Sequence, residues 1–317
     1  MCSRSAVLFF FNVLKSFKQS RSEQDEKLYF CCKIIDMATP VELEKITSQV
    51  RRDIVRMVNA VSSGHPGGSL GCAEFFVALY NEVMEHNAAS FSMKGTGEDL
   101  FFLSNGHISP VWYSVLARSG YFPVSELATF RKINSRLQGH PTTHEKLPGI
   151  RIASGSLGQG LSAAIGAASA KKLDGDDKLV YVLMGDGEQQ EGQVWEAVMY
   201  AAHNKIDNVI ATIDYNNAQI DGTCDEVLSL GDLKGKYQAF GWEVLETNGN
   251  NVVELLATLK EAKAKTGQGK PILILMTTIM GNGVDFMMGT NGWHGKAPND
   301  EQTAAALAQN EETLGDY

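Results

Sequence analysis

From position 41 onward, the hydrophobic residues first follow the spacing of a helix and later form short continuous runs. Steps of three and four residues with basic residues between them, as at Leu43, Ile46 and Val50, predict amphipathic helices. Continuous apolar runs of up to six residues predict buried strands. The predicted helices cover residues 41–61, 73–84, 111–119, 125–132, 161–172, 194–202 and 252–264. The predicted strands cover residues 100–103, 179–184, 209–213, 244–245 and 271–277.

Continuous apolar strands that alternate with helices are typical of a parallel sheet covered on both faces. We therefore expect an α/β fold with a doubly wound, mainly parallel sheet, formed by one domain over residues 37–300. Residues 64–71 are expected to form a loop between two helices, and residues 301–317 an irregular tail. In such sheets, ligands bind at the carboxyl ends of the strands, so the polar residues at these ends are the first candidates for function.

The first 36 residues lack this patterning, and we expect them to be a poorly structured extension. Their apolar run, Ala6–Leu14, is too short to cross a bilayer, which needs about 20 residues, and no small-residue cleavage site follows it. A signal peptide is therefore the weaker interpretation. Because Met37 immediately precedes the first patterned helix, we hypothesise that translation starts at Met37.

Composition narrows the possible partners. The 317 residues include 28 Lys and Arg against 37 Asp and Glu, a formal net charge of −9, which disfavours nucleic acid or an anionic membrane surface as a partner. The five cysteines are odd in number and form no C-x-x-C pair, which indicates neither a disulfide framework nor a zinc site. We expect a cytoplasmic protein.

Two polar residues follow neighbouring predicted strands. Asp186 comes directly after the strand at residues 179–184, and Asn216 follows the next strand, thirty residues later. One strand–helix–strand crossover has this length and brings the two strand ends together. A carboxylate and an amide oxygen are suitable ligands for Mg²⁺, which keeps other positions for water and phosphate oxygens. Alternatively, Asp186 caps the following helix and Asn216 makes a turn.

A glycine-rich segment, Gly155-Ser156-Leu157-Gly158-Gln159-Gly160, opens a helix of small residues. Main-chain N–H groups at such a helix start attract anions, so the segment is a candidate phosphate site. It also partly matches the dinucleotide fingerprint, but residues 150–153 make a poor preceding strand and the following acidic residues come too early. A purely structural role, close packing of the small-residue helix, is the alternative.

Four of the seven histidines lie in glycine-containing loops: His65, His107, His140 and His294. Imidazoles gathered in one cleft can bind sugar hydroxyls or phosphates and transfer protons near neutral pH. A single loop histidine is usually a surface residue, but four similar contexts favour a shared site. His140 and His144 are four residues apart, yet Pro141 disfavours the helix that a zinc pair would need.

Taken together, these motifs resemble the thiamine-diphosphate-binding N-terminal half of transketolase. The resemblance extends from about Thr47 to Asp300 and includes five motifs in the family's order. These are Ser63-Gly64-His65-Pro66-Gly67, Ser104-Asn105-Gly106-His107, residues 155–160, the Gly185-Asp186-Gly187…Asn216 pair and Trp293-His294-Gly295.

The resemblance implies specific roles for the candidate residues. Asp186, Asn216 and the main-chain carbonyl of Ala218 would ligate Mg²⁺ or Ca²⁺, which holds the diphosphate of thiamine diphosphate. The cofactor contacts would come from His107, Gly155, Ser156, Leu157, Gly187, Asn216 and His294. Substrate would be bound by His65, His140 and His294, of which His65 and His294 would be catalytic. The reaction would transfer a two-carbon ketol unit from xylulose 5-phosphate to ribose 5-phosphate or erythrose 4-phosphate in the pentose phosphate pathway.

Single-chain transketolases continue into a pyrimidine-binding domain and a C-terminal domain, whereas this sequence ends at Tyr317. We therefore expect a split enzyme whose separate C-terminal subunit supplies those domains, in a heterotetramer with two copies of each chain that acts on sugar phosphates. Glu191 and Glu196 lie where related enzymes couple two active sites, although they could equally be solvated helix charges.

Other thiamine-dependent enzymes remain as alternatives. The alpha chain of a 2-oxo acid dehydrogenase shares the Gly-Asp-Gly…Asn motif, but His65-Pro66 and Gly106-His107 argue against it. A 1-deoxyxylulose-5-phosphate synthase carries its second domain in the same chain. Two further alternatives are a transketolase for a specialised sugar and a non-catalytic chain that only binds the cofactor. The last is disfavoured because the metal, diphosphate and channel positions are all intact.

Overall fold

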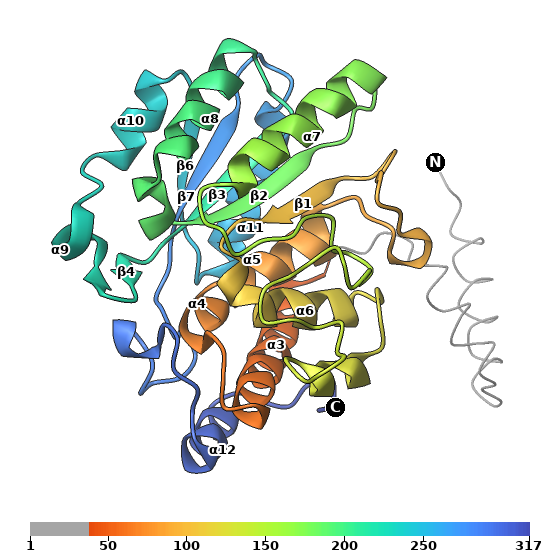
Figure 1. Ribbon diagram of the computed structural model, residues 1–317, viewed down its shortest axis with the longest axis vertical. Helices are drawn as coiled ribbons and strands as arrows, with labels where there is room; N and C mark the ends of the chain where they lie inside the picture. The colour runs from red at the N-terminus through yellow and green to blue at the C-terminus, as the bar shows by residue number, and fades with distance from the viewer. Residues whose placement is uncertain (1–37) are drawn as a thin grey trace, which may run out of the picture. The chain divides into compact units, whose positions relative to one another are not determined.

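A parallel sheet forms the centre of the protein, of which the computed structural model describes residues 38–317 (Figure 1). Within these residues the sheet has five strands, and every neighbouring pair is parallel. Their spatial order is β1 (Leu100–Leu103), β2 (Val180–Gly185), β3 (Val209–Tyr215), β7 (Ile272–Thr277) and β6 (Glu243–Asn248). The predicted α/β fold is confirmed. Beyond the end of β3, β4 (Ala218–Gln219) and β5 (Gly222–Thr223) form a small antiparallel ribbon, which the short helix α9 (Cys224–Leu228) follows.

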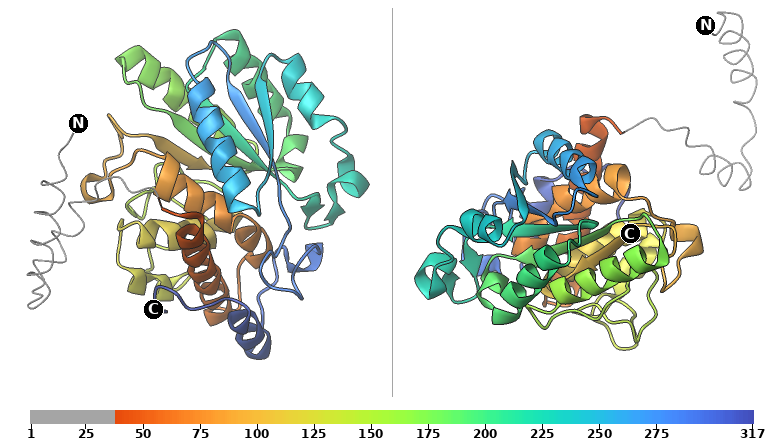
Figure 2. Two further views of the ribbon diagram at one scale, coloured as in Figure 1. Left: turned by 180° about the vertical axis from the view of Figure 1, so that it is seen from behind. Right: turned by 90° about the horizontal axis from the view of Figure 1, so that it is seen from above.

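Helices cover both faces of the sheet (Figures 1 and 2). Alternate strand residues point to opposite faces, so Phe101 and Leu183 enter one hydrophobic cluster while Phe102 and Val182 enter the other. The first cluster includes residues of α3 (Pro40–Ala60), α5 (Ala73–Ala78), α6 (Ser109–Arg118) and α11 (Val252–Lys265). The second includes residues of α7 (Gly160–Asp174), α8 (Gly192–His203) and α10 (Leu233–Ala239).

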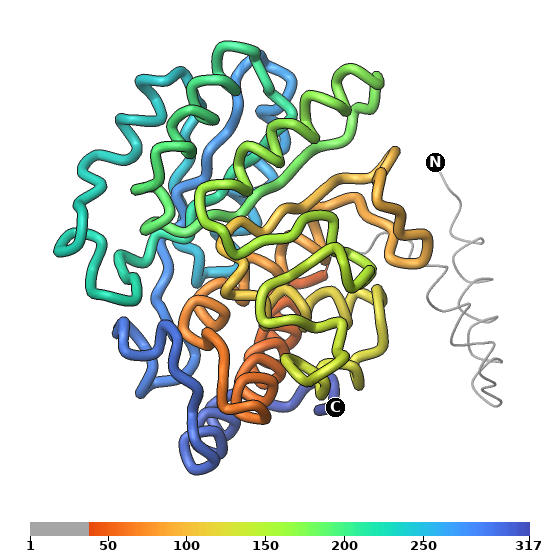
Figure 3. The backbone as a smooth tube through the Cα atoms, in the orientation of Figure 1, coloured from red at the N-terminus to blue at the C-terminus, as the bar shows by residue number. Residues whose placement is uncertain are grey.

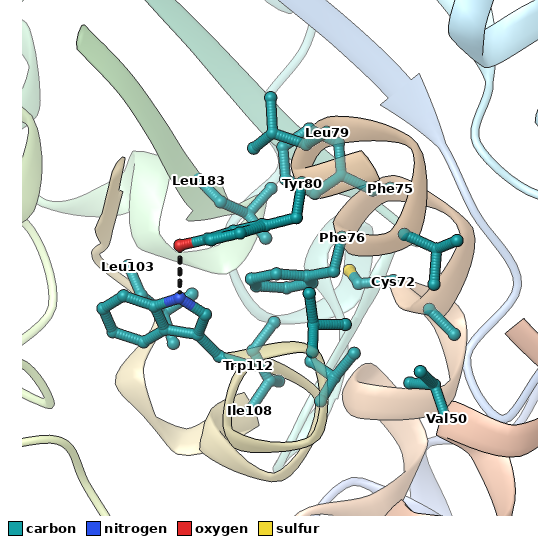
Figure 4. Packing of buried hydrophobic residues seen from close by; sticks show 14 of the residues in the cluster. Val50, Cys72, Phe75, Phe76, Leu79, Tyr80, Leu103, Ile108, Trp112 and Leu183 are labelled. Atoms are coloured by element: carbon teal, nitrogen blue, oxygen red, sulfur yellow. Dashed lines mark hydrogen bonds between the residues drawn. The ribbon is translucent and has the colours of Figure 1, made fainter. Parts of the chain in front are cut away.

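Aromatic side chains fill the core between the sheet and α6 (Figure 4). Phe76, Phe101 and Trp112 meet edge to face, with ring centroids 5.3 Å apart in both pairs. The buried indole N–H of Trp112 donates to the hydroxyl of Tyr80 at 2.8 Å, so neither polar group is left without a partner. This packing fixes the sheet against the helices that position the loops at its carboxyl edge.

Several local predictions differ from the structure. Residues 64–71 were expected to form a loop, but Pro66–Gly71 form helix α4, where proline at the first helical position needs no N–H acceptor. The expected helix over residues 73–84 changes at Leu79 into a π-helical turn, and the one over residues 125–132 is a 3₁₀ segment, Val124–Thr129. This 3₁₀ segment belongs to the long, mostly irregular connection between α6 and α7, which runs beside α6 (Figure 3).

Helix α12 (Asp300–Ala308) lies where an irregular tail was expected. Asn299 caps its first turn by accepting from the N–H of Gln302 at 2.8 Å. The residues after α12 are held to α3 by an ion pair of 2.7 Å between Arg52 and Asp316. The structure therefore joins the C-terminal segment to the same compact unit, residues 38–317.

The predictions for residues 1–36, including the apolar run and the start at Met37, lie outside the described residues. Between residues 38 and 317, no helix is both long and apolar enough to cross a bilayer.

Candidate active site

Asp186 and Asn216 meet at the ends of β2 and β3, as their spacing predicted. The main-chain N–H groups of Asn216 and Asn217 donate to Asp186 Oδ2 at 2.9 and 2.5 Å, and that of Gly187 donates to Oδ1 at 2.7 Å. Asn216 Oδ1 accepts from the N–H of Ala218 at 2.9 Å. The local cap and turn that formed the alternative interpretation are therefore present, and they place the two oxygen-bearing side chains together.

A second buried carboxylate, Asp214, lies behind this pair. One of its oxygens accepts from the hydroxyl of Thr278, and the other accepts from Asn216 Nδ2 at 3.0 Å. Burial raises the pKa of Asp214 to about 7. The hydrogen bond from Thr278 lowers this pKa in part, whereas the nearby charge of Asp186 raises it. Because the amide nitrogen of Asn216 points to Asp214, its oxygen is directed to the opposite side.

Among the described residues, no Lys, Arg or His balances the charge of these carboxylates. Asp186 is 3% exposed and Asp214 is 2% exposed, yet within residues 38–317 neither is in an ion pair with Lys, Arg or His. The same part of the chain contains no group of three or more His, Cys, Asp and Glu side chains that could hold a metal. A cation here would need oxygens of Asp186, an amide, the main chain and a bound ligand, the donor set that suits a diphosphate-bound Mg²⁺.

The four loop histidines converge on one cluster, although they come from four separate segments. The ring of His65, which precedes α4, lies 5.1 Å from that of His107, 6.3 Å from that of His140 and 5.7 Å from that of His294. His107 follows β1, and its ring is 5.1 Å from that of His294. His144 instead points to solvent, with 89% of its side chain exposed, so it is not part of the cluster.

Burial keeps these imidazoles neutral. Burial, with smaller contributions from His294, Arg131 and His140, lowers the pKa of His65 to about 4. Burial also lowers the pKa values of His107, His140 and His294. Near pH 7 each ring therefore offers one N–H donor and one acceptor nitrogen. The cluster can bind hydroxyl groups and exchange protons with them.

Two N–H groups at the start of α7 are already bound by the protein. The N–H of Gly158 donates to Glu188 Oε1 at 2.7 Å, and the N–H of Gly160 donates to Ser104 Oγ at 3.1 Å. The expectation that the helix start itself attracts a phosphate is therefore wrong at these two positions, because Glu188 and Ser104 occupy them. Among the described residues, no acceptor is found for the N–H groups of residues 155–157.

Close contacts between the loops leave no space for larger residues at several glycines. A Cβ atom added at Gly106 would lie 2.5 Å from Ser154 Oγ, and one at Gly155 would lie 2.8 Å from the His140 ring. Gly155 also has a φ of 124°, a conformation that favours glycine. At Gly187 an added Cβ would lie 2.6 Å from Gln219 Oε1, so the end of this side chain would have to move. These glycines let the three loops approach each other.

Unpartnered buried polar atoms line the same region. In the described chain, His65 Nδ1, His294 Nδ1, Asn105 Oδ1 and Ser154 Oγ are buried without a hydrogen-bond partner. Buried polar atoms are normally paired, so these atoms indicate a polar ligand. Together with the unbalanced Asp186, they fit a diphosphate cofactor with its cation.

Sequence reasoning missed Asp214, Glu188 and Ser154. The position of Asp214, two residues before Asn216 at the end of a buried strand, was a usable signal. By contrast, the sequence does not show that Glu188 contacts Ser104 and the 155–160 segment, because that contact depends on tertiary structure.

Comparison with known proteins defines the class. The model of the transketolase family's thiamine diphosphate binding domain matches residues 43–312, and the chain therefore belongs to the transketolase family.

Among individual proteins, the chain is similar along most of its length to subunits of two transketolases. It is 38% identical over 272 residues to an apulose-4-phosphate transketolase subunit of Phocaeicola vulgatus, covering 86% of this chain and 95% of that protein. It is 37% identical over 272 residues to the 6-deoxy-6-sulfo-D-fructose transketolase subunit SqwG of a Clostridium species, covering 85% and 96%.

Solved structures agree with the observed fold. Transketolase from Leishmania mexicana matches with a TM-score of 0.79 and 32% identity, covering 88% of this chain. This chain spans only 43% of that longer chain. The similarity therefore covers less than half of the longer enzyme, but nearly all of each of the two subunits.

Proposed function

We propose that this chain is the thiamine-diphosphate-binding subunit of a two-subunit transketolase, which transfers a two-carbon ketol unit between sugars. The observation that supports this most is a pair of buried carboxylates, Asp186 and Asp214, beside a cluster of four neutral histidines. Within residues 38–317 neither carboxylate has an ion-pair partner. The similarity to the two transketolase subunits over 95% or more of their length supports the same assignment.

In this proposal, Asp186, the Asn216 amide oxygen and the Ala218 carbonyl hold Mg²⁺ or Ca²⁺, and the cation binds the cofactor's diphosphate. The N–H groups of residues 155–157, with Gly187 and His107, contact the cofactor. When bound, thiamine diphosphate supplies the electron sink that cleavage of a carbon–carbon bond next to a carbonyl requires.

The histidines act on the sugar. His65 and His294 would exchange protons with the substrate's hydroxyl and carbonyl oxygens, since both rings are neutral near pH 7 and their buried Nδ1 atoms have no partner within the described residues. His294 would also lie near the cofactor. His140, 6.3 Å from His65, would bind substrate hydroxyls along the same channel.

The partner would be a separate C-terminal subunit that supplies the pyrimidine-binding and C-terminal domains, with two copies of each chain in the assembly. Glu191 and Glu196 are both exposed at the start of α8 and are available to contact another chain.

The similar proteins change which donor sugar we propose. The names of the two similar subunits specify apulose 4-phosphate and 6-deoxy-6-sulfofructose, which supports a specialised sugar more than the pentose phosphate pathway. We therefore propose an anionic ketose as donor and an aldose phosphate as acceptor, with xylulose 5-phosphate as the reference donor.

The direct test measures ketol transfer by the chain mixed with a candidate C-terminal subunit from the same organism, in the presence of Mg²⁺ and thiamine diphosphate. The donors are xylulose 5-phosphate, apulose 4-phosphate and 6-deoxy-6-sulfofructose, and the two chains assayed separately are the controls. Activity only in the mixture supports the proposal, and the ranking of kcat/KM identifies the donor. A bound but inactive pair with all three donors would contradict it.

A further inference from the structure

Glu188 connects three loops that come from different parts of the chain. Oε1 accepts from the hydroxyl of Ser104, which follows β1, and from the N–H of Gly158 at 2.7 Å. Oε2 accepts from the N–H of Gly185, at the end of β2, at 3.1 Å. Ser104 Oγ in turn accepts from the N–H of Gly160 at 3.1 Å. One carboxylate thus joins the loop after β1, the start of α7 and the loop after β2.

The surroundings of this carboxylate are those of a fixed structural anion. Glu188 is 2% exposed, and within the described residues it forms no ion pair with Lys, Arg or His. Its donors are two main-chain N–H groups and a hydroxyl, and the positive end of the α7 dipole adds to their attraction for an anion. Glu188 therefore occupies, inside the protein, the position that a bound phosphate takes at many helix N-termini.

The loops that Glu188 joins carry the proposed cofactor residues. Ser104 is three residues from His107, Gly158 follows the unpaired N–H groups of residues 155–157, and Gly185 precedes Asp186. Oε1 of Glu188 accepts two hydrogen bonds and Oε2 accepts one, all from these loops, and the residue is only 2% exposed. We therefore expect its effect on binding to be indirect, through the loops that it joins.

We propose that Glu188 is a positioning residue that holds the 104–107, 155–160 and 185–187 loops in the geometry that binds the cofactor's diphosphate. This inference rests on the proposed function, and it adds the group that aligns the three loops. It predicts that loss of Glu188 opens these loops locally and weakens cofactor binding, while the rest of the fold keeps its stability.

The test compares Glu188→Ala and Glu188→Gln with a matched control, Asp53→Asn. Asp53 is also a fully buried carboxylate with three donors, from Ser114 and Arg118, but it joins α3 to α6, away from the three loops. Glutamine retains one oxygen for Ser104 and Gly158 and places an amide N–H against the N–H of Gly185, so we expect it to be intermediate. Ser104→Ala, which removes only the hydroxyl, serves as a milder variant if Glu188→Ala does not fold.

Two measurements test this role: hydrogen exchange and the affinity for the cofactor. Hydrogen exchange of the purified chain should show lost protection at Gly158, Gly160 and Gly185 in the Glu188 variants, and unchanged protection there in Asp53→Asn. In the assembled two-subunit enzyme with Mg²⁺, the Kd for thiamine diphosphate should rise by about 10- to 100-fold in Glu188→Ala, the range seen for residues that orient ligands.

The outcomes separate this inference from the proposed function. Unchanged exchange at the three glycines, or an unchanged Kd in Glu188→Ala, would overturn the positioning role. An equal rise in Kd for Asp53→Asn would also overturn it, because the effect would then follow general stability. If the wild-type enzyme binds no thiamine diphosphate, the proposed function fails, and the exchange data alone decide whether Glu188 holds the loops.

Discussion

Two regions of this protein differ in how the charge of a buried carboxylate is compensated. Between α3 and α6, Asp53 is fully buried and paired with Arg118, whose Nε and Nη2 donate at 2.6 and 2.8 Å. At the carboxyl edge of the sheet, Asp186 and Asp214 are also buried, but their partners within residues 38–317 are neutral N–H, O–H and S–H groups.

The difference shows which carboxylates serve the fold. A buried charge is costly unless it is paired. Asp53 has its counter-ion, Arg118, within the fold itself, so its charge is compensated without a ligand. The edge carboxylates are compensated only in part, and burial raises the pKa values of both Asp186 and Asp214. A divalent cation would supply the missing positive charge, which is why we assign this edge to cofactor binding.

The largest effect on stability is expected for Asp53→Asn. This change removes one partner of a buried ion pair and leaves Arg118 without its counter-ion, which costs about 3–5 kcal/mol of unfolding free energy. Urea unfolding measures the loss. Affinity for thiamine diphosphate, corrected for the folded fraction, should stay at the wild-type value, and a large fall in affinity would erase the contrast between the two regions.

The matched change at the other region is Asp186→Asn. It removes a proposed metal ligand, so the Mg²⁺-dependent affinity of the assembled enzyme for thiamine diphosphate should fall by more than about 100-fold, beyond the loss for an orienting residue. Titration calorimetry gives the affinity. The free energy of unfolding without metal should fall less than in Asp53→Asn, because Asp186 is not paired with a Lys, Arg or His in the described part of the chain. Wild-type affinity in this variant would remove Asp186 from the site.

A smaller effect is expected for Asp214→Asn. Asp214 accepts from Asn216 Nδ2, so an amide in its place can reverse the orientation of the Asn216 side chain and turn its oxygen away from the cation. We expect a loss of about 10- to 100-fold in Mg²⁺ affinity, measured as the Mg²⁺ concentration that gives half-maximal cofactor binding. Thr278→Val, which removes the other donor, is the companion variant and should give a loss in the same direction.

The smallest expected effect is on the pH dependence of the free energy of unfolding. The pKa of His65 is about 4 in the folded protein and about 6.5 in an unfolded chain, so between these values the unfolded state binds more protons. The stability of the metal-free chain should be full above pH 6.5 and fall as the pH decreases toward 4. The urea midpoint should therefore drop less between about pH 7 and pH 5 in His65→Asn than in the wild type. An equal drop would show that His65 does not contribute.

The sequence predicted the elements that have a clear period and the residues at the ends of strands. The parallel order of β2 and β3 follows from one crossover, so the meeting of Asp186 and Asn216 could be predicted from their spacing. The four histidines were predicted to share a cleft because their glycine-containing contexts are alike, and their rings do lie together.

What the sequence did not predict depends on tertiary contacts. Helix α4 has no hydrophobic period because all six of its residues are buried, so residues 66–71 resembled a loop. Helix α12 has little difference in polarity between its faces, and its local signals were the Asn299–Gln302 capping box and the acidic residues Asp300 and Glu301 in its first turn. Glu188 looked like an ordinary polar residue at the start of a helix, since its partners Ser104 and Gly158 are distant in sequence.

The measurement that tests the central claim most directly is the affinity of the assembled wild-type enzyme for thiamine diphosphate with Mg²⁺ and after removal of divalent cations with EDTA. Our account predicts saturable binding that is lost with EDTA and restored by added Mg²⁺, because the cation connects Asp186 and Asn216 to the diphosphate. Binding of equal affinity with and without the cation would contradict it.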